Sequence, residues 1–150
     1  MASSHVAATV LTAFVSLAAP LAAQEEPVAP STVDAFKEAF NSAVRARDVE
    51  AWARLVAEDV VMMAPSGRVI EGREAFRELW TRSFAGQTGP NPLQLSMIEV
   101  RTAGDLAVAR VDYGPEGQEP VGQYVWVLGR DIRGVWSLDW WIFNRRPPPQ

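Results

Sequence analysis

Few side chains in this sequence could do acid-base or nucleophilic chemistry. The chain has one histidine, His5, and no cysteine, so once the N-terminal segment is removed Ser-His-Asp and Cys-His catalysis are excluded. The same composition excludes zinc sites of the usual His/Cys kind, and we expect neither a metal nor a cofactor. Carboxylate pairs such as Glu58-Asp59 are too scattered for a hard cation, and we interpret this one as a surface pair at a helix end.

The last predicted strand, Val135 to Asn144, carries the best candidate acid. Strict alternation places four residues on one face, Ser137, Asp139, Trp141 and Phe143. An apolar face with a single carboxylate is typical of a small-molecule pocket, so Asp139 is the best catalytic candidate. The alternative is that Asp139 is a solvent-facing strand residue.

The other predicted pocket residues are aromatic, thioether or polar side chains: Trp52, Met62, Trp80, Arg110, Tyr113, Tyr124, Trp126 and Trp141. Each has a simpler interpretation. Trp52, Met62 and Trp80 are of the types that pack in cores, and Arg110 could form a surface pair with Asp112. The two tyrosines would supply pocket hydroxyls.

Two adjacent tryptophans in the last predicted strand indicate how the protein assembles. Trp140 and Trp141 must point to opposite faces of one strand, so both faces of the sheet are expected to be covered. Helices cover the inner face, and a second copy of the same sheet is the simplest cover for the outer one, which predicts a homodimer. The alternative is that helices and long loops cover both faces.

The two ends of the chain differ from its centre. Residues 6–23 contain no charge and end in Pro20-Leu21-Ala22-Ala23, which predicts a signal peptide over 1–23 and an exported, periplasmic or extracellular protein without a membrane anchor after cleavage. The first five residues lack Lys and Arg, so an uncleaved anchor is the alternative. An acidic, proline-containing linker follows over 24–30, the domain spans 31–144, and a proline-rich tail occupies 145–150.

The periodicity of the domain changes once. Three helices are expected first, one capped by Ser31, one capped by Asp48 and one from Gly72 to Gly86, with a short hairpin around Pro65-Ser66-Gly67 between the last two. Four period-two segments follow, over 94–100, 106–113, 121–129 and 135–144, separated by turn-sized connections. This order predicts an α+β domain with three N-terminal helices packed against an antiparallel sheet.

Net charge excludes one class of partner. The formal charge is −4, whereas proteins that bind nucleic acids or acidic membranes present basic surfaces. We therefore expect no nucleic-acid partner.

Several local runs resemble the nuclear-transport-factor-2-like superfamily, whose members have a cystatin-like α+β fold. These runs are residues 48–52, 58–61, 65–67, 71–76, 134–138 and 143–144. The chain looks closest to the small bacterial branch with polyketide-cyclase-like (SnoaL-like) and uncharacterised secreted domains. The resemblance implies a cone-shaped sheet around helices, a pocket at its wide end and frequent homodimers.

Comparison with ketosteroid isomerase, a member of this superfamily, argues against its activity here. In an ungapped alignment Ala64 stands at the general base, Phe40 at the oxyanion-binding tyrosine and Trp126 near the strand acid. None of these side chains can take part in proton transfer. Two functions remain: an exported domain that binds a small, largely apolar molecule, and a non-catalytic dimeric module with a plugged cone. An isomerase, cyclase or hydrolase that uses Asp139 is a minor variant of the first.

Overall fold

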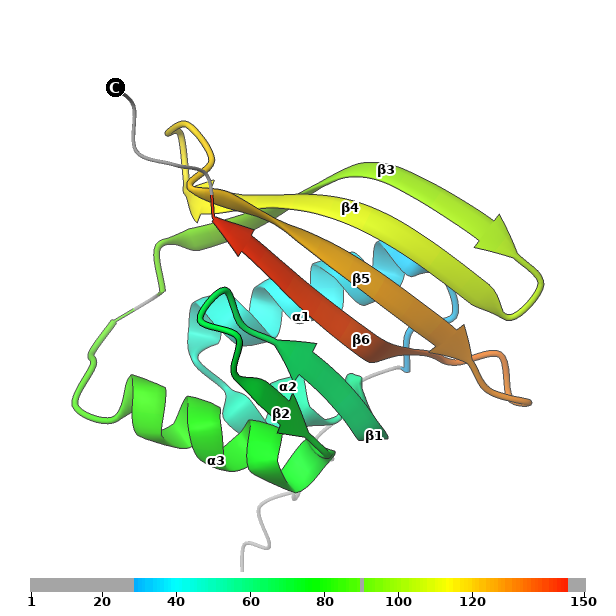
Figure 1. The fold of residues 1–150 in the computed structure, drawn as a ribbon, viewed down its shortest axis with the longest axis horizontal. Helices are drawn as coiled ribbons and strands as arrows, with labels where there is room; N and C mark the ends of the chain where they lie inside the picture. Colours follow the sequence, from blue (N-terminus) through cyan, green and yellow to red (C-terminus); the bar gives the residue numbers. More distant parts are fainter. Residues whose placement is uncertain (1–28, 90, 146–150) are drawn as a thin grey trace, which may run out of the picture.

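The computed structural model describes residues 29–89 and 91–145, which form three helices and one sheet of six strands (Figure 1). The helices are α1 (Val33–Ala46), α2 (Val49–Ala53) and α3 (Arg73–Phe84). The strands are β1 (Val56–Met63), β2 (Val69–Glu71), β3 (Leu93–Ala103), β4 (Leu106–Pro115), β5 (Gly122–Arg130) and β6 (Trp136–Arg145). The predicted α+β order is confirmed. The signal segment 1–23, residues 24–28 of the linker and residues 146–150 of the tail lie outside the described residues.

The sheet is mixed, which corrects the prediction of an antiparallel one. Its strand order is β2-β1-β6-β5-β4-β3, and β1 runs parallel to β6 while the other neighbours are antiparallel. Turn-sized connections specify the antiparallel pairs. They say nothing about β1 and β6, because α3 and four strands separate these two in the sequence.

Helix α1 begins one residue later than the sequence predicted. The cap is Thr32, not Ser31, because the Thr32 hydroxyl accepts a hydrogen bond of 3.1 Å from the Ala35 N–H. The buried side of the helix carries the residues Phe36, Phe40, Ala43 and Val44. Asn41 joins the helix to the sheet, since its amide group both donates to and accepts from the Leu95 backbone at 3.0 Å.

Helices α2 and α3 pack together beside β1. The predicted Asp48 cap is confirmed, with its carboxylate 2.8 Å from the Ala51 N–H. Helix α3 follows Gly72, whose φ of 87° is the reason for a glycine there. The Arg73 guanidinium donates to the Val56 carbonyl at 2.7 and 3.0 Å, which attaches the start of α3 to the first strand.

A β-bulge in β6 changes which residues face the helices. Trp126 of β5 pairs with Trp141, whereas Leu128, two residues later, pairs with Leu138, three residues earlier, so Asp139 is the extra residue. Leu138 and Trp141 consequently face the same side and are 0% and 1% exposed. The predicted shared face for Asp139 and Trp141 is therefore wrong, because strict alternation cannot anticipate a bulge.

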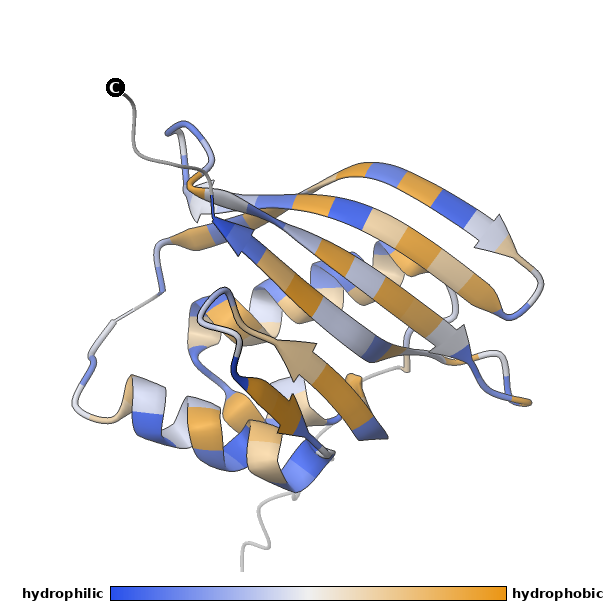
Figure 2. Cartoon of the chain, viewed as in Figure 1, coloured by the Kyte–Doolittle hydropathy of each residue, from blue (hydrophilic) through white to orange (hydrophobic). Residues whose placement is uncertain are grey.

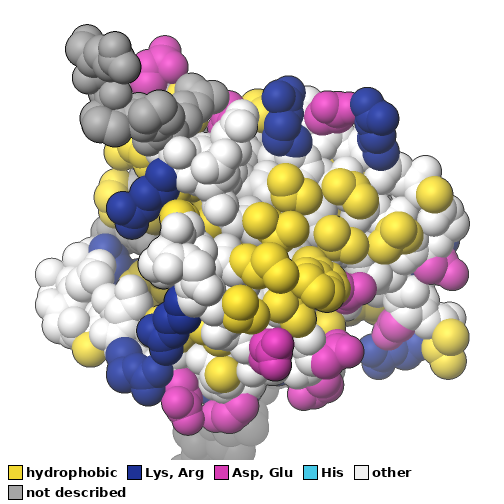
Figure 3. All heavy atoms as spheres, in the orientation of Figure 1, with side chains coloured by type: hydrophobic (Ala, Val, Ile, Leu, Met, Phe, Trp, Pro, Cys, Tyr) yellow, Lys and Arg dark blue, Asp and Glu magenta, His cyan; other side chains and the backbone are white. Residues whose placement is uncertain are grey.

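The two faces of the sheet have different surroundings. Helices cover the inner face, and hydropathy alternates along the strands (Figure 2). The largest fully buried side chains lie between helices and sheet: Trp52, Trp126, Trp141, Phe36, Phe40 and Phe76. The outer face, on the side away from α1, exposes an apolar patch (Figure 3), here defined as Leu106, Val108, Val125, Trp140 and Ile142. Among the described helices, none has the length and apolarity to span a bilayer.

Candidate functional site

An aromatic cavity of about 190 Å³ lies between the helices and the inner face of the sheet. We call it the inner cavity. Its lining consists of Phe40, Val44, Trp52, Trp80, Ser83, Phe84, Gln87, Asn91, Leu93, Leu95, Tyr124 and Trp141. The volume is below the 300–1,000 Å³ that is typical for drug-sized ligands, so it suits a molecule of one or two rings. A larger groove beside α1, about 620 Å³, has no buried residue in its lining and is a feature of the open surface.

The helices supply one wall of the inner cavity. Ser83 and Phe84 come three and four residues after Trp80, so both share a side of α3 with it. Trp52 of α2 lies at the centre of the ring cluster, with its centroid 4.6 Å from that of Trp80 and 5.3 Å from that of Phe40. The rings hold one another in place, which gives the cavity fixed walls.

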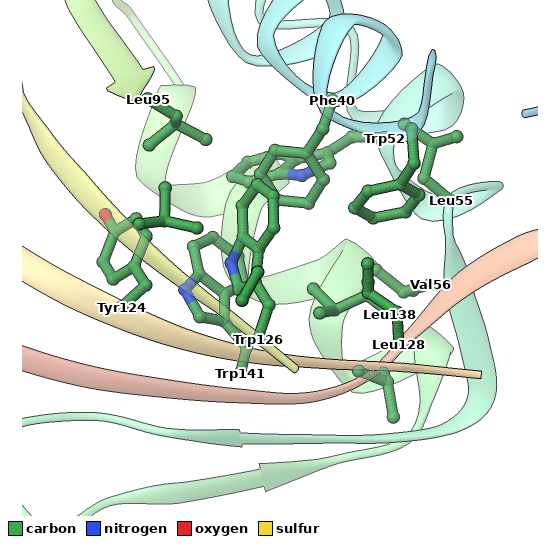
Figure 4. Close-up of a cluster of buried hydrophobic side chains, with 14 of the residues drawn as sticks. Phe40, Trp52, Leu55, Val56, Leu95, Tyr124, Trp126, Leu128, Leu138 and Trp141 are labelled. Carbon is green, nitrogen blue, oxygen red and sulfur yellow. The ribbon is translucent and has the colours of Figure 1, made fainter. Parts of the chain in front are cut away.

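The sheet supplies the opposite wall, from Leu95, Tyr124 and Trp141 (Figure 4). The Tyr124 ring stacks on Tyr113 with a centroid distance of 4.1 Å and an interplanar angle of 7°. Burial, and secondarily the neighbouring Tyr113, raise the pKa of Tyr124 far above its ordinary value. Its hydroxyl is therefore protonated at any physiological pH and can donate a hydrogen bond, but it cannot serve as a phenolate base.

Four indole N–H groups are buried without a hydrogen-bond partner, those of Trp52, Trp80, Trp126 and Trp141. All but Trp126 belong to residues that line the inner cavity. In Figure 4 the indole nitrogens of Trp126 and Trp141 lie on the sides of their rings that face Tyr124. Each buried N–H without a partner costs about 1–3 kcal/mol, so these groups mark a place where acceptors are missing.

The amide side-chain oxygens of the lining are already used. The Gln87 side-chain oxygen accepts from the Arg47 guanidinium at 3.0 Å, and the Asn91 side-chain oxygen accepts from the Leu93 N–H at 3.1 Å. Arg47 also donates to the carbonyls of Thr88 and Gly89. The side-chain acceptors that remain in the described lining are the hydroxyls of Ser83 and Tyr124.

Arg47 ends α1 in an uncommon backbone conformation and contacts two residues of the lining, Gln87 and Phe84. It caps α1 with a φ of 53°, in the left-handed region that is uncommon for residues other than glycine. From this position its guanidinium carbon lies 5.7 Å from the centroid of the Phe84 ring. Arg47 therefore connects the end of α1 to the segment that follows α3.

The structure brings together only part of the predicted pocket set. Trp52, Trp80, Tyr124 and Trp141 line the inner cavity. Met62, Tyr113 and Trp126 are buried in the surrounding core and are not among the lining residues. Arg110 lies on the outer face, exposed beside Val108 and Val125 in a shallow hollow, so its placement in the pocket was wrong. The alternation along β4 and β5 puts it opposite the buried tyrosines.

Asp139 also lies outside the cavity, which corrects its prediction as the pocket acid. A Cβ atom on Gly129 would stand 2.5 Å from an Asp139 carboxylate oxygen, and Gly129 points to the outer face because its neighbour Leu128 points inward. The Ser137 hydroxyl, 3.5 Å away, donates to the same carboxylate. Partial burial, and then the negative charge of Asp59, raise the pKa of Asp139. From this position it cannot reach a molecule in the inner cavity.

Sequence reasoning missed eight lining residues: Phe40, Val44, Ser83, Phe84, Gln87, Asn91, Leu93 and Leu95. For Ser83 and Phe84 a signal existed, since both share the helical face of Trp80. Gln87 and Asn91 lie in a connection, where no periodicity indicates direction. Within residues 29–89 and 91–145, no three His, Cys, Asp or Glu side chains are close enough together to hold a metal ion.

Comparison with known proteins identifies the class first. A protein described as a calcium/calmodulin-dependent protein kinase type II association domain, from Thiobacillus denitrificans, matches with a TM-score of 0.68 and 23% identity, covering 81% of this chain and 100% of its own. A ketosteroid isomerase-like protein from Erwinia carotovora atroseptica matches with a TM-score of 0.62 and 21% identity over 77% and 95% of the two chains. A nuclear-transport-factor-2-like protein of unknown function from Pseudomonas putida gives 0.59 and 24% over 75% and 82%. These similarities establish a cystatin-like, nuclear-transport-factor-2-like fold.

The family follows from the sequence match. The SnoaL-like domain model matches residues 33–132, and the chain belongs to that family. The predicted resemblance is confirmed. A search of curated proteins found no significant match. Of the three positions aligned with ketosteroid isomerase, Phe40 lines the cavity, Trp126 is fully buried in the core, and Ala64 follows β1 without lining the cavity.

Proposed function

We propose that this protein binds a small, largely apolar organic molecule in the inner cavity and acts as a binding domain without acid-base catalysis. The observation that carries the proposal is the cavity itself, whose walls are aromatic rings from three helices and the sheet. The lining described above contains no carboxylate, lysine or arginine. Apolar walls with a few polar groups are typical of small-molecule sites.

Blocking the mouth of the cavity tests this function. Ser83 is exposed and lines the cavity, so Ser83→Trp would place a large side chain at the entrance without disturbing buried packing. Thr81→Trp is the matched control, since Thr81 is an exposed neighbour on the same helix and lies outside the lining. The readout is the thermal unfolding temperature with one- and two-ring aromatic compounds, because a ligand of the folded state raises it.

Saturable stabilisation in the wild type and in Thr81→Trp, lost in Ser83→Trp, is the expected result. A well-folded wild type that no compound of any class stabilises would contradict the proposal. It would favour the second candidate function, a dimeric structural module whose interior is filled by its own side chains. The packed rings of Phe40, Trp126 and Trp141, with centroids 4.7 and 5.3 Å from Phe40, favour that alternative for the deep end of the interior.

Export is a further part of the proposed function. The uncharged segment 6–23 followed by Gln24-Glu25-Glu26 supports cleavage after Ala23 and location in the periplasm or outside the cell. The mass of the protein purified from cells tests this. Loss of the first 23 residues is expected, and a full-length mass in the membrane fraction would favour the uncleaved anchor.

We also propose a homodimer through the outer face. The residues of the apolar patch, Leu106, Val108, Val125, Trp140 and Ile142, are 37–47% exposed. Arg110 of β4 and the Arg101–Glu99 ion pair of β3 lie on the strands at one side of the patch, and Glu58 and Asp59 lie on β1, toward the opposite edge of the sheet. A two-fold arrangement of two copies would bring the basic side of one to the acidic side of the other, which supports a second copy as the occupant.

A charge placed in the patch tests this assembly. Val125→Glu should convert a dimer into a monomer in sedimentation velocity, because it would bury an unpaired charge at the interface. Val121→Glu, at an exposed valine just before β5, is the control and should leave the oligomeric state unchanged. A wild-type monomer at all concentrations tested would contradict the dimer.

A further inference from the structure

The open edge of the sheet is an interaction surface separate from the inner cavity and from the apolar patch. We infer that β3 pairs along this edge with β3 of a second copy of the chain, antiparallel and centred on Val100. Three features of the strand support this pairing, namely its position in the sheet, the direction of its backbone groups and the charges beside Val100. None of them depends on the proposed binding function or on the proposed outer-face dimer.

Strand β3 is a long strand at the end of the sheet. It has 11 residues and stands last in the order β2-β1-β6-β5-β4-β3, so none of the described strands lies beyond it (Figure 1). Asn41 covers its free edge at Leu95, because the Asn41 amide bonds to both backbone groups there. Residues 98–102 lie farther along the strand and all have exposed side chains. Unpaired N–H and C=O groups along a strand edge are a template for another strand.

The register of the sheet fixes the direction of the backbone groups at Val100. Asp105, directly before β4, accepts a hydrogen bond of 2.8 Å at its carbonyl from the N–H of Arg130 on β5. Every second residue from Asp105 therefore directs its N–H and C=O toward β5, and Ala109 is one of them. Val100 stands opposite Ala109. Directly opposite residues either bond to each other or both bond away from each other, so the N–H and C=O of Val100 point to the free edge.

The charges beside Val100 are complementary to those of a second copy. Glu99 and Arg101 line the same hollow of the outer face, beside Val108. In antiparallel pairing about Val100, Glu99 of each copy stands opposite Arg101 of the other. Centring the pairing on Glu99 or on Arg101 would instead place two like charges opposite each other, which is destabilising. Charges commonly protect edge strands from pairing, but this pair selects one self-complementary register.

A β-bulge limits the length of the new ladder. The register between β3 and β4 shifts between Met97 and Glu99, which makes Ile98 the extra residue. Regular pairing with a second copy is therefore confined to the few residues around Val100. Glu99 and Arg101 already form an exposed ion pair within one copy, which contributes little and is readily exchanged for the two pairs between copies. We expect a reversible association whose extent rises with protein concentration.

Two single-cysteine variants test the register, since the chain has no cysteine of its own. In a hydrogen-bonded antiparallel pair the two Cα atoms are about 5.5 Å apart, within the range that a disulfide bridges. Val100→Cys should therefore form a covalent dimer when oxidised by dissolved oxygen and copper. Thr102→Cys is the matched control, exposed on the same face of the strand, but its two copies would lie about 14 Å apart. It should cross-link about tenfold more slowly, because its effective concentration is lower.

This cross-link reports on the edge and not on the outer face. Val100 stands opposite Ala109, which is 0% exposed on the inner face, so the side chain at position 100 points away from the apolar patch. A dimer through the outer face cannot bring two such cysteines together. Adding Trp140→Glu, three strands away in the patch, should therefore leave the cross-linking of Val100→Cys unchanged.

Charge changes beside Val100 test the complementarity. With Val100→Cys present, Arg101→Glu and Glu99→Arg should each slow cross-linking several-fold, because like charges then stand opposite each other. An equimolar mixture of these two variants should recover it as a heterodimer, in which every opposite pair has unlike charges. In ¹⁵N-labelled wild-type protein, hydrogen exchange of the Val100 amide should slow as the protein concentration rises, since this N–H then donates to the second copy.

The outcomes decide the proposal. Equal cross-linking of Val100→Cys and Thr102→Cys would overturn the pairing, because random collision would explain both. A loss in the charge variants that their mixture does not reverse would overturn the register. Exchange of the Val100 amide that is independent of concentration would show that the charges and the bulge keep this edge unpaired. Each result leaves the inner cavity and its Ser83→Trp test unaffected.

Discussion

The inner and outer faces of β5 are two different kinds of apolar surface. Facing inward, Tyr124, Trp126 and Leu128 are 5%, 0% and 0% exposed, whereas the outward Val125 between them is 38% exposed. Both faces are apolar, but only the inner one combines rings held in fixed orientations with buried donors that lack partners. The difference teaches that hydrophobicity alone does not distinguish the candidate cavity from the outer apolar patch, whereas unmet hydrogen-bonding capacity does.

The largest expected effect is a difference in stability between substitutions on the inner face and on the outer face. Trp126→Ala should lower the free energy of unfolding by about 3–5 kcal/mol, because it removes a fully buried ring from the cluster. Trp140→Ala, at a side chain 41% exposed on the outer face, should cost about 1 kcal/mol or less at low protein concentration. Urea unfolding measures both, and equal losses would show that the faces do not differ as described.

A medium effect is expected from two glycines on the same strand. On the inner side, a Cβ on Gly122 would stand 2.5 Å from the Asn144 carbonyl oxygen and against the Tyr113 ring, so Gly122→Ala should cost about 1–3 kcal/mol. On the outer side, Gly129→Ala meets only the carboxylate end of Asp139, which can move, and should cost less than about 1 kcal/mol.

Combining Gly129→Ala with Asp139→Ala tests why Gly129→Ala lowers stability. The double variant should recover the loss of Gly129→Ala, since the carboxylate that the new methyl group meets is then gone. If the double variant shows no recovery of stability in chemical denaturation, the Asp139 side chain does not lie beside Gly129.

The smallest effect is a pH dependence on the outer face. Because burial and Asp59 raise the pKa of Asp139 in the folded state, the folded protein binds more protons than the unfolded chain above the ordinary Asp pKa of about 3.9. This group therefore lowers stability as the pH rises from that value through its raised pKa. Asp139→Asn should be relatively more stable at neutral pH than the wild type, with the difference disappearing in acid. A difference that does not vary with pH would contradict the raised pKa.

Local patterns in the sequence predicted much of the fold. The Asp48 cap, the hairpin around Gly67, helix α3 after Gly72 and the four-strand meander all follow from short-range turn and cap chemistry. The inward direction of Tyr124 and Trp126 follows from alternation on a strand without a bulge. The parallel pairing of β1 with β6 could not be predicted, because it joins segments that no local connection relates.

The candidate site was predicted less well than the fold, for a definite reason. The tryptophans of α2, α3 and β6 converge on the cavity because large aromatic residues are buried wherever a core forms. The misplacement of Asp139 follows from one extra residue in β6, and Arg110 was assigned to a pocket although its strand turns it outward. Gln87 and Asn91 depend on how Arg47 attaches the segment after α3, which is a tertiary contact.

The bulge at Asp139 affects how β6 tolerates insertions and deletions during evolution. The bulge accommodates Asp139 as an extra residue and so keeps Trp141 and Phe143 inside and Trp140 and Ile142 outside. Deletion of the Asp139 codon would give a regular strand with the same two sets of faces, whereas loss of the bulge with Asp139 retained would exchange them, bringing Trp140 into the interior and Trp141 to the surface. This strand can therefore gain or lose one residue at the bulge without exchanging the side chains of the inner cavity and of the apolar patch.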